Sequence, residues 1–220
     1  TSKANDAKTY LDYQDANVGI ITGTYAATII HDVFPDATVK EFASISDMML
    51  ALTQGKIDII LNDVSYYTCM KWEGMNVDRL EEPYTTTDFG IAFKKGENAQ
   101  LREQMNAFIA KIKENGEYDR LQEKWFGDTE PTECADPSTL TGENGTLKVG
   151  TNNEAKPFGY IKNGRIVGYD VDFLVAFAKE YGYKLDIEEV AFPSLLAGLQ
   201  TGIYDLSIAG LSITEERMET

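Results

Sequence analysis

The chain has few of the residues on which metal sites and disulfide frameworks depend. Its 220 residues include one histidine, His31, and two cysteines, Cys69 and Cys134. Neither cysteine belongs to a CxxC pair, and a zinc site needs about four clustered ligands, so we predict no metal site. Two cysteines are also too few for a disulfide scaffold, and the sequence leaves open whether they pair or stay free.

Motifs of several common enzyme classes are missing as well. The sequence contains no GxxxxGK[ST], GxGxxG, HExxH or GxSxG. A Ser-His-Asp triad would have to use His31, which lies in TIIHDVF and is interpreted as a packing or surface residue of a helix. We therefore predict no catalytic residue and no cofactor, and we look for a binding function instead.

Basic residues are scarce relative to acids. Lys and Arg total 20 against 36 Asp and Glu, a formal net charge of −16. This balance argues against a nucleic-acid partner, because phosphates are bound by clustered Lys and Arg, and it disfavours docking to an anionic membrane. No apolar run approaches the roughly 18 residues of a membrane helix, and the opening residues, TSKANDAK, do not form a signal peptide.

An internal repeat is the most informative feature that the sequence contains. Residues 48–65 and 194–212 each run through an apolar helical stretch, a Gly, an Asp three positions later and a second apolar run. Gly55 and Gly202 are predicted to end the helices in the left-handed conformation. Each repeat thus predicts a helix followed by a strand.

The apolar runs after Asp58 and Asp205, which are residues 59–61 and 206–208, are typical of buried parallel strands. Residues 18–23 and 147–151 resemble each other more weakly, and each is predicted to be the first strand of its unit. Alternating strands and helices predict the α/β fold class with parallel sheets. The chain is therefore expected to form two similar lobes.

Three further helices are predicted from apolar residues at helical spacing. Their apolar faces are Leu101, Met105, Phe108 and Ile112; Tyr118, Leu121 and Trp125; and Val171, Leu174, Phe177, Ala178 and Tyr181. Residues 128–145 contain two prolines, two glycines and almost no apolar bulk. We interpret this segment as a linker, which as a flexible coil would span about 20–25 Å.

Polar residues follow the predicted strands, at the edge where α/β sheets bind ligands. These segments are Thr22–Tyr25, Asn62–Asp63, Asn152–Glu154 and Gly210–Arg217. A helix N-terminus and an Arg suit a carboxylate, and an Asp suits an ammonium group. Together they match the zwitterionic backbone of an amino acid.

The motifs PFGY, GYDVDFLVAFAK and AGLSITEER resemble the N-terminal stretch of the family-3 extracellular solute-binding proteins, the amino-acid-binding proteins of ABC uptake systems. Residues 8–127, ending in NGEYDRLQEKWFG, resemble the C-terminal stretch of that family. The resemblance implies a two-lobed periplasmic-binding-protein fold of type II, each lobe a mainly parallel sheet flanked by helices. It implies these parts: lobe 2 at 1–86, C-terminal helices completing lobe 1 at 87–127, the linker at 128–145, and the N-terminal part of lobe 1 at 146–220.

The two stretches occur in inverted order relative to the family. The chain resembles either a circular permutant or a slice of a protein with tandem copies. A crossover strand of the family, expected between Thr220 and Thr1, is missing, and the other connection is expected near Glu82–Phe89. Whether another chain supplies the missing strand is left open.

The resemblance also implies the roles of individual residues. Arg217 is expected to hold the ligand α-carboxylate, and Asp63 to pair with its α-ammonium group. The remaining expected ligand-binding residues are Gly210 and Ser212 for the amino-acid head, Phe192 for stacking, Thr22, Thr24 and the Tyr25 N–H from the second lobe, and Asn62 and Asn152 for side-chain selectivity. Ala155 and Tyr25 depart from the family pattern, the first replacing an aromatic residue and the second a small one.

Each of these residues also has a purely structural interpretation. Arg217 could be a surface charge, Asp63 a turn or helix cap, and Phe192 a core residue. Ser212 and Thr214 could cap the helix that begins at TEER, and capping is compatible with binding.

The resemblance implies a receptor that binds a free, polar amino acid between its lobes and delivers it to an ABC transporter permease. A neutral ligand side chain is favoured because no second basic residue is visible for a side-chain carboxylate. The protein would be extracellular or periplasmic and would meet the membrane through the permease, a fused permease or an anchor. The alternatives are a ligand-sensing domain of a membrane signalling receptor, a binding-inactive spacer, and a dehydratase-type enzyme on the same fold, with Glu154 as its candidate carboxylate.

Overall fold

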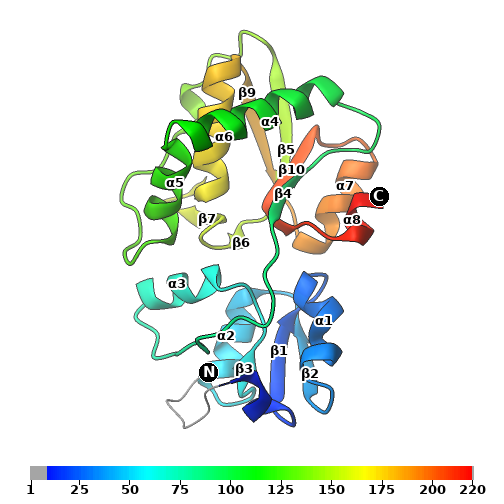
Figure 1. The fold of residues 1–220 in the computed structure, drawn as a ribbon. Coiled ribbons are helices and arrows are strands. Elements are labelled where there is room, and N and C mark those ends of the chain that lie inside the picture. Colours follow the sequence, from blue (N-terminus) through cyan, green and yellow to red (C-terminus); the bar gives the residue numbers. More distant parts are fainter. Residues whose placement is uncertain (1–8, 220) are drawn as a thin grey trace. The chain divides into compact units, whose positions relative to one another are not determined.

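The computed structural model describes residues 9–219, apart from the side chain of Glu219; residues 1–8 and Thr220, at the ends of the two predicted lobes, lie outside the described residues. The chain divides into two compact units, unit 1 up to Asp88 and unit 2 from Phe89 onward. Figure 1 shows that each unit contains strands covered by helices. The predicted α/β class with mainly parallel sheets is confirmed in both units.

Unit 1 contains a three-stranded sheet in the order β2-β1-β3, in which both neighbouring pairs are parallel. Its elements are η1 (Tyr10–Tyr13), β1 (Asn17–Ile21), α1 (Tyr25–Val33), β2 (Thr38–Phe42), α2 (Ile45–Thr53), β3 (Ile59–Ile60) and α3 (Ser65–Trp72).

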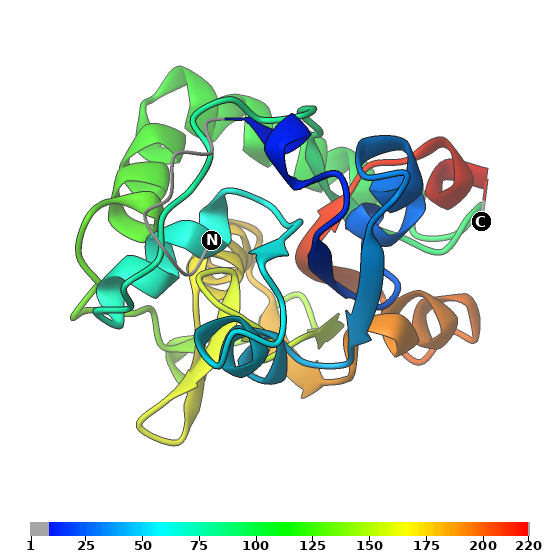
Figure 2. The ribbon, with the colours of Figure 1, turned by 90° about the horizontal axis from the view of Figure 1, so that it is seen from below.

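The alternation of side chains along β1 places α1 and α2 on opposite faces of this sheet. Val18 and Ile20 pack against α1 in one buried cluster, whereas Ile21 packs against α2 in another. Figure 2 shows the two helices on either side of the strands. Both faces of the sheet are therefore covered, as expected for parallel strands.

Unit 2 contains a four-stranded sheet in the order β4-β10-β5-β9 and a small antiparallel sheet in the order β6-β7-β8. In the larger sheet, β4 alone is antiparallel to its neighbour. The elements are β4 (Phe89–Ala92), α4 (Ala99–Glu114), α5 (Glu117–Phe126), η2 (Pro137–Thr139), β5 (Thr146–Thr151), β6 (Glu154–Ala155), β7 (Gly159–Lys162), β8 (Arg165–Val167), α6 (Tyr169–Tyr181), β9 (Lys184–Glu189), η3 (Phe192–Ser194), α7 (Leu195–Gln200), β10 (Leu206–Ser212) and α8 (Glu215–Glu219).

The core of unit 2 combines two stretches that are distant in the sequence. Phe108 of α4 contacts Phe173 and Phe177 of α6 edge to face, at ring-centroid distances of 5.4 and 5.6 Å. All four residues of the predicted α4 face are buried in the same cluster as Leu174 of α6. The stretch before residue 128 and the stretch after residue 145 thus share one core.

The aspartate of each sequence repeat has the same structural role. The Oδ2 atom of Asp58 accepts a hydrogen bond from the backbone N–H of Asn17 at 2.9 Å, and that of Asp205 accepts one from Lys148 at 2.8 Å. Hydrogen bonding from Asn17 lowers the pKa of Asp58. Each aspartate therefore joins the start of the repeat's strand to the backbone of the neighbouring parallel strand, β1 in unit 1 and β5 in unit 2.

The repeat glycines and strands behave largely as predicted, with one difference. Gly55 and Gly202 have φ values of +68° and +75°, the left-handed conformation expected after a helix. Leu61, predicted in the strand after Asp58, lies outside β3, while β10 extends to Ser212. In unit 2 the antiparallel partner β4 pairs with the far end of β10 and keeps that end extended.

The segment 128–145 is not the free coil that its composition predicts. The Asp172 carboxylate of α6 accepts a hydrogen bond from the Ala135 backbone at 2.7 Å. Glu130 accepts one from the Tyr160 hydroxyl at 2.8 Å, and Lys162 reaches the Glu130 carboxylate at 3.1 Å. These bonds, which composition does not reveal, attach the segment to unit 2.

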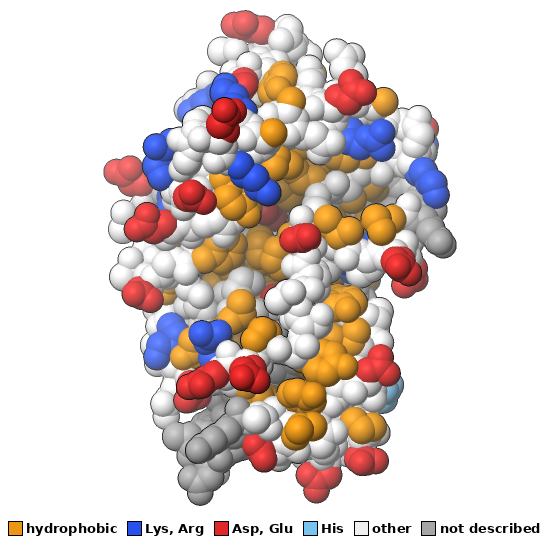
Figure 3. All heavy atoms as spheres, viewed as in Figure 1, with side chains coloured by type: hydrophobic (Ala, Val, Ile, Leu, Met, Phe, Trp, Pro, Cys, Tyr) orange, Lys and Arg blue, Asp and Glu red, His pale blue; other side chains and the backbone are white. Residues whose placement is uncertain are grey.

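Acidic side chains are spread over the face shown in Figure 3, and Lys and Arg side chains are scattered among them. No helix within residues 9–219 combines the length and the apolarity needed to cross a bilayer.

We expect Asp172→Ala to destabilise unit 2 by about 3–5 kcal/mol, because a buried, multiply bonded charge leaves its partners unsatisfied when it is removed. The carboxylate accepts hydrogen bonds from Lys124 Nζ at 2.5 Å, from Trp125 Nε1 at 3.0 Å and from Ala135 N. The free energy of unfolding in denaturant measures the loss. The control Glu97→Ala removes an exposed pair with Lys94 and should cost under about 1 kcal/mol. Equal losses in the two variants would contradict this account of the segment 128–145.

Candidate functional site

Three of the predicted site residues lie together at the end of β10. Arg217 donates from a guanidinium nitrogen to the backbone oxygen of Ser212 at 2.8 Å, and its guanidinium carbon lies 5.9 Å from the centroid of the Phe192 ring. The Arg217 N–H also donates to the Thr214 hydroxyl at 3.2 Å, so the capping interpretation of Thr214 is correct. The result is a guanidinium held between an aromatic ring and a strand end.

Gly210 lies in an irregularity of β10, where the register with β4 shifts between Ser207 and Leu211. Its φ of +58° is a left-handed conformation, and a Cβ atom there would lie 2.9 Å from the Phe158 ring. Glycine is therefore required at this position both for its backbone conformation and for the approach of Phe158. The irregularity comes two residues before Ser212, which is itself buried.

A carboxyl that the sequence did not single out lies behind this irregularity. Asp170, in the first turn of α6, is 3% exposed, and the backbone N–H of Gly210 is a hydrogen-bonding partner of its carboxyl group. Burial is the largest influence and raises the pKa of Asp170 to about 8. Near neutral pH the protonated form therefore predominates.

Asn152 follows β5 as predicted, but its amide is engaged locally. The Nδ2 atom donates to the Val190 backbone oxygen at 2.9 Å, and the Oδ1 atom accepts from the Glu154 N–H at 3.1 Å. The side chain is 6% exposed. These bonds fix the turn between β5 and β6.

In unit 1, Thr22, Thr24 and Tyr25 form the turn from β1 into α1. The Thr22 hydroxyl donates to Glu41 Oε2 at 3.1 Å, and the Thr24 hydroxyl donates to the Ile21 backbone oxygen at 2.7 Å. Thr24 occupies the N-cap position and Tyr25 begins the helix. The Tyr25 N–H therefore belongs to the first turn, whose N–H groups lack partners within the helix.

Asn62 and Asp63 follow β3, also in unit 1. The Asp63 N–H donates to Asn62 Oδ1 at 2.9 Å, and the Asp63 backbone oxygen accepts from the Tyr66 N–H at 3.1 Å. Within the described residues the buried Nδ2 atom of Asn62 has no hydrogen-bond partner. This pair thus leads directly into α3 and leaves one buried donor unsatisfied.

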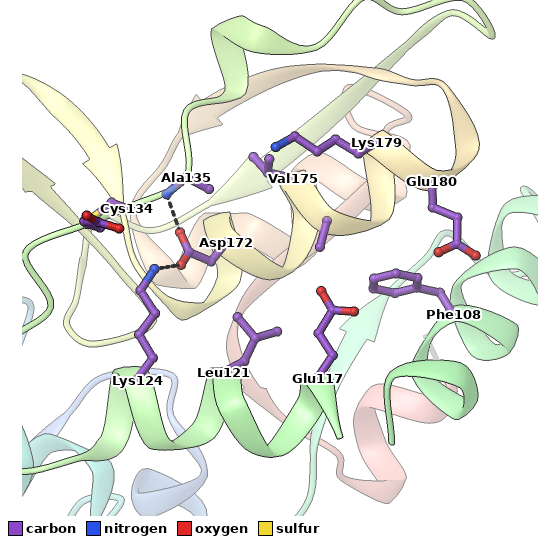
Figure 4. Close-up of a pocket in the computed structure, with 12 residues that line it drawn as sticks. Phe108, Glu117, Leu121, Lys124, Cys134, Ala135, Asp172, Val175, Lys179 and Glu180 are labelled. Carbon is purple, nitrogen blue, oxygen red and sulfur yellow. Dashed lines mark hydrogen bonds and ion pairs between the residues drawn. The ribbon is translucent and has the colours of Figure 1, made fainter. Parts of the chain in front are cut away.

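A cavity with a volume of about 650 Å³ lies elsewhere, on unit 2 between α4, α5, α6 and the segment 128–145. Figure 4 shows Lys124 and Ala135 bonded to Asp172 at this cavity, with Cys134 beside them. Burial raises the pKa of the Cys134 thiol, so it is not an activated nucleophile. None of the predicted site residues lines the cavity.

Two features of the site were missed from the sequence. The motif GYDVDFLVAFAK contains Asp170 and Asp172, but only its apolar face was interpreted. Both carboxyl groups are buried, one with three donors and one with a single backbone donor. One signal in the sequence could have found them. The two aspartates lie two residues apart in the first turn of a predicted helix whose other residues are mostly apolar, so at least one of them must face the core.

Comparison with known proteins identifies a family. The family model described as bacterial extracellular solute-binding proteins, family 3, matches residues 10–128 and 147–220. The chain is 32% identical over 106 residues to the ABC transporter glutamine-binding protein GlnH of Bacillus subtilis (strain 168), covering 48% of this chain and 38% of that protein.

Two solved structures are similar over shorter stretches. One is an ancestral cationic amino acid solute binding protein, 40% identical, with a TM-score of 0.33, covering 35% of this chain and 34% of that one. Another is an ancestral cyclohexadienyl dehydratase, 36% identical, with a TM-score of 0.33, covering 35% and 32%. The chain thus spans only between 32% and 38% of these relatives.

We expect the free energy of unfolding to fall as pH rises from about 4 to 8, because Asp170 has a raised pKa in the folded state. Over this window the folded state holds a proton that the unfolded state has lost, which costs stability at up to about 1.4 kcal/mol per pH unit. Asp170→Asn, which is always neutral, should be about as stable as the parent at about pH 4 and more stable at about pH 8.5. Denaturant titrations at both pH values measure the difference in unfolding free energy between the parent and the variant. If that difference is the same at both pH values, the raised pKa of Asp170 is contradicted.

Proposed function

The chain belongs to the bacterial extracellular solute-binding proteins, family 3, and on that basis we propose that it binds a free, polar amino acid and delivers it to the permease of an ABC transporter. The observation that carries the proposal is the arrangement of Arg217, Phe192 and Ser212 in unit 2. A planar guanidinium suits a carboxylate, because its paired N–H groups match the two oxygens. All three residues lie within the stretch matched by the family model.

The proposal gives each part of the ligand a partner. Arg217 and the Ser212 hydroxyl bind the α-carboxylate, and Phe192 packs on the ligand side chain. Because the Gly210 N–H is bonded to Asp170, Gly210 is proposed to bond the amino-acid head through its backbone oxygen. Asp63 of unit 1 pairs with the α-ammonium group.

The remaining residues of the proposed site are assigned as follows. Thr22, Thr24 and the Tyr25 N–H add polar contacts from unit 1. The unsatisfied Nδ2 of Asn62 supports a role in recognising a polar ligand side chain. Asn152, whose amide already has two backbone partners, is proposed to act through the shape of its turn.

The proposed location is extracellular or periplasmic, as the name of the family indicates. Contact with the membrane is proposed to occur through the permease or through an anchor. The curated relative GlnH is named as an ABC transporter protein that binds glutamine, which supports both a transporter partner and an amino-acid ligand.

No reaction is proposed for this chain. The dehydratase alternative would need an acid or base at the ligand, and Glu154, its candidate carboxylate, is exposed on β6. The permuted or tandem order of the two stretches remains a proposal as well. It is supported by the core that the stretch before residue 128 and the stretch after residue 145 share within unit 2.

Titration calorimetry against the twenty amino acids tests the ligand class. We expect binding of a polar amino acid with a dissociation constant below about 100 µM, equivalent to more than about 5 kcal/mol. Neutral polar side chains should bind more tightly than acidic ones, because no second basic residue is proposed at the site. A folded sample that gives no binding heat at millimolar amino acid would contradict the proposal.

Replacing Arg217 tests the carboxylate partner. We expect Arg217→Ala to weaken binding by about 2–5 kcal/mol, because the ligand carboxylate then loses a charged hydrogen-bond donor. Arg217→Lys should recover part of this loss, since an ammonium keeps the charge but not the planar fork. The control Arg102→Ala, at an exposed position on α4, should bind as the parent does. Parent-like affinity in Arg217→Ala would place Arg217 outside the binding site.

A further inference from the structure

The carboxyl of Asp170 joins the start of α6 to the irregular part of β10. Its own N–H donates to the Phe158 backbone oxygen at 3.0 Å, and its carboxyl group is the hydrogen-bonding partner of the Gly210 N–H. The Phe158 ring closes the other side of Gly210. Gly210 is thus confined by two neighbours that are themselves bonded to each other.

Among the described residues, no lysine or arginine side chain stabilises a negative charge on Asp170. Lys124 of α5 pairs with Asp172, and Arg217 bonds the Ser212 backbone oxygen. Tyr169 interacts electrostatically with Asp170, and burial raises the pKa of its phenol, so it stays neutral at physiological pH. The Oδ2 atom of Asp170 is buried without a partner among residues 9–219.

We propose that Asp170 is a positioning residue for the amino-acid site, which holds Gly210 in its left-handed conformation and favours ligand binding only while its carboxyl group is protonated. The inference rests on the proposed function, because it concerns the same strand end. The neutral carboxyl can accept the Gly210 N–H through its carbonyl oxygen without placing a charge in an apolar environment.

Ionisation of Asp170 opposes ligand binding for two reasons. A buried carboxylate without a counter-charge is unstable, and it is relieved by movement of the adjacent segment or by entry of water. The proposed ligand carboxylate at Ser212, two residues beyond Gly210, would add a second negative charge nearby. Both effects favour the protonated form in the complex, so binding should take up a proton.

Ligand affinity measured between pH 7 and pH 9 tests the dependence on the proton. If only the protonated form binds and the pKa of Asp170 is about 8, affinity should weaken about tenfold over this range. The variant Asp170→Asn keeps a neutral acceptor and should lose this dependence. Because the ligand is the same for both proteins, any pH dependence of the ligand itself cancels in the comparison.

Two further measurements separate positioning from a general loss of stability. Asp170→Val, which has no acceptor, should bind at least tenfold more weakly than Asp170→Asn at pH 7. In ligand-free protein, the amide resonance of Gly210 should shift with a midpoint near pH 8 in the parent and stay constant in Asp170→Asn. If Asp170→Val does not fold, the pH dependence of ligand affinity and of the Gly210 amide resonance, compared between the parent and Asp170→Asn, still tests the role of Asp170.

The outcomes distinguish this inference from the proposed function. If an amino acid binds with the same pH dependence in the parent and in Asp170→Asn, or if the Gly210 amide does not titrate, the role of Asp170 is overturned. If no amino acid binds but the Gly210 amide titrates with Asp170, the proposed function fails and the coupling between the two residues is supported.

Discussion

Unit 2 depends on a carboxylate that is buried where three segments meet. Asp172 accepts hydrogen bonds from Lys124, Trp125 and the backbone of Ala135, which belong to α5 and to the segment after it. Since Asp172 itself lies on α6, these bonds join the stretch before residue 128 to the stretch after residue 145. The apolar contacts of Phe108 with Phe173 and Phe177 join α4 to α6, while the carboxylate of Asp172 bonds two side chains of α5 to α6.

Two aspartates of the same helix turn therefore have opposite electrostatic environments. Asp172 has a lysine partner at 2.5 Å and two further donors, whereas Asp170 has only the Gly210 N–H, and burial raises the pKa of its carboxyl group. The distinction matters because Asp170 supports the irregular end of β10, close to Ser212.

Much of the architecture could be predicted from the repeat in the sequence. Asp58 and Asp205 mark equivalent strands, and in both units the aspartate accepts a hydrogen bond from the backbone of the neighbouring strand, a local pattern that sequence similarity retains. The helical faces were also predictable, because Leu101, Met105 and Ile112 recur at helical spacing. The length of β10 was not, since it depends on pairing with β4, more than a hundred residues away in the chain.

The candidate site was predictable only as far as single segments allow. The order of residues in AGLSITEER places Ser212 near Arg217, and the structure puts their atoms in contact. The distance from Phe192 to Arg217, and the burial of Asp170 behind Gly210, depend on how separate elements pack. Hydrogen bonds that occupy the Asn152 amide are likewise invisible in its sequence context.

The attachment of residues 128–145 changes how this part of the chain should be regarded in protein engineering. Its backbone and side chains supply bonds to Asp172, Tyr160 and Lys162, so it is a structural component and not a tether. A glycine-serine spacer of equal length would preserve connectivity while deleting these contacts, and it would leave Asp172 with fewer donors. Grafting unit 2 onto another scaffold would therefore require this connector to be carried along intact.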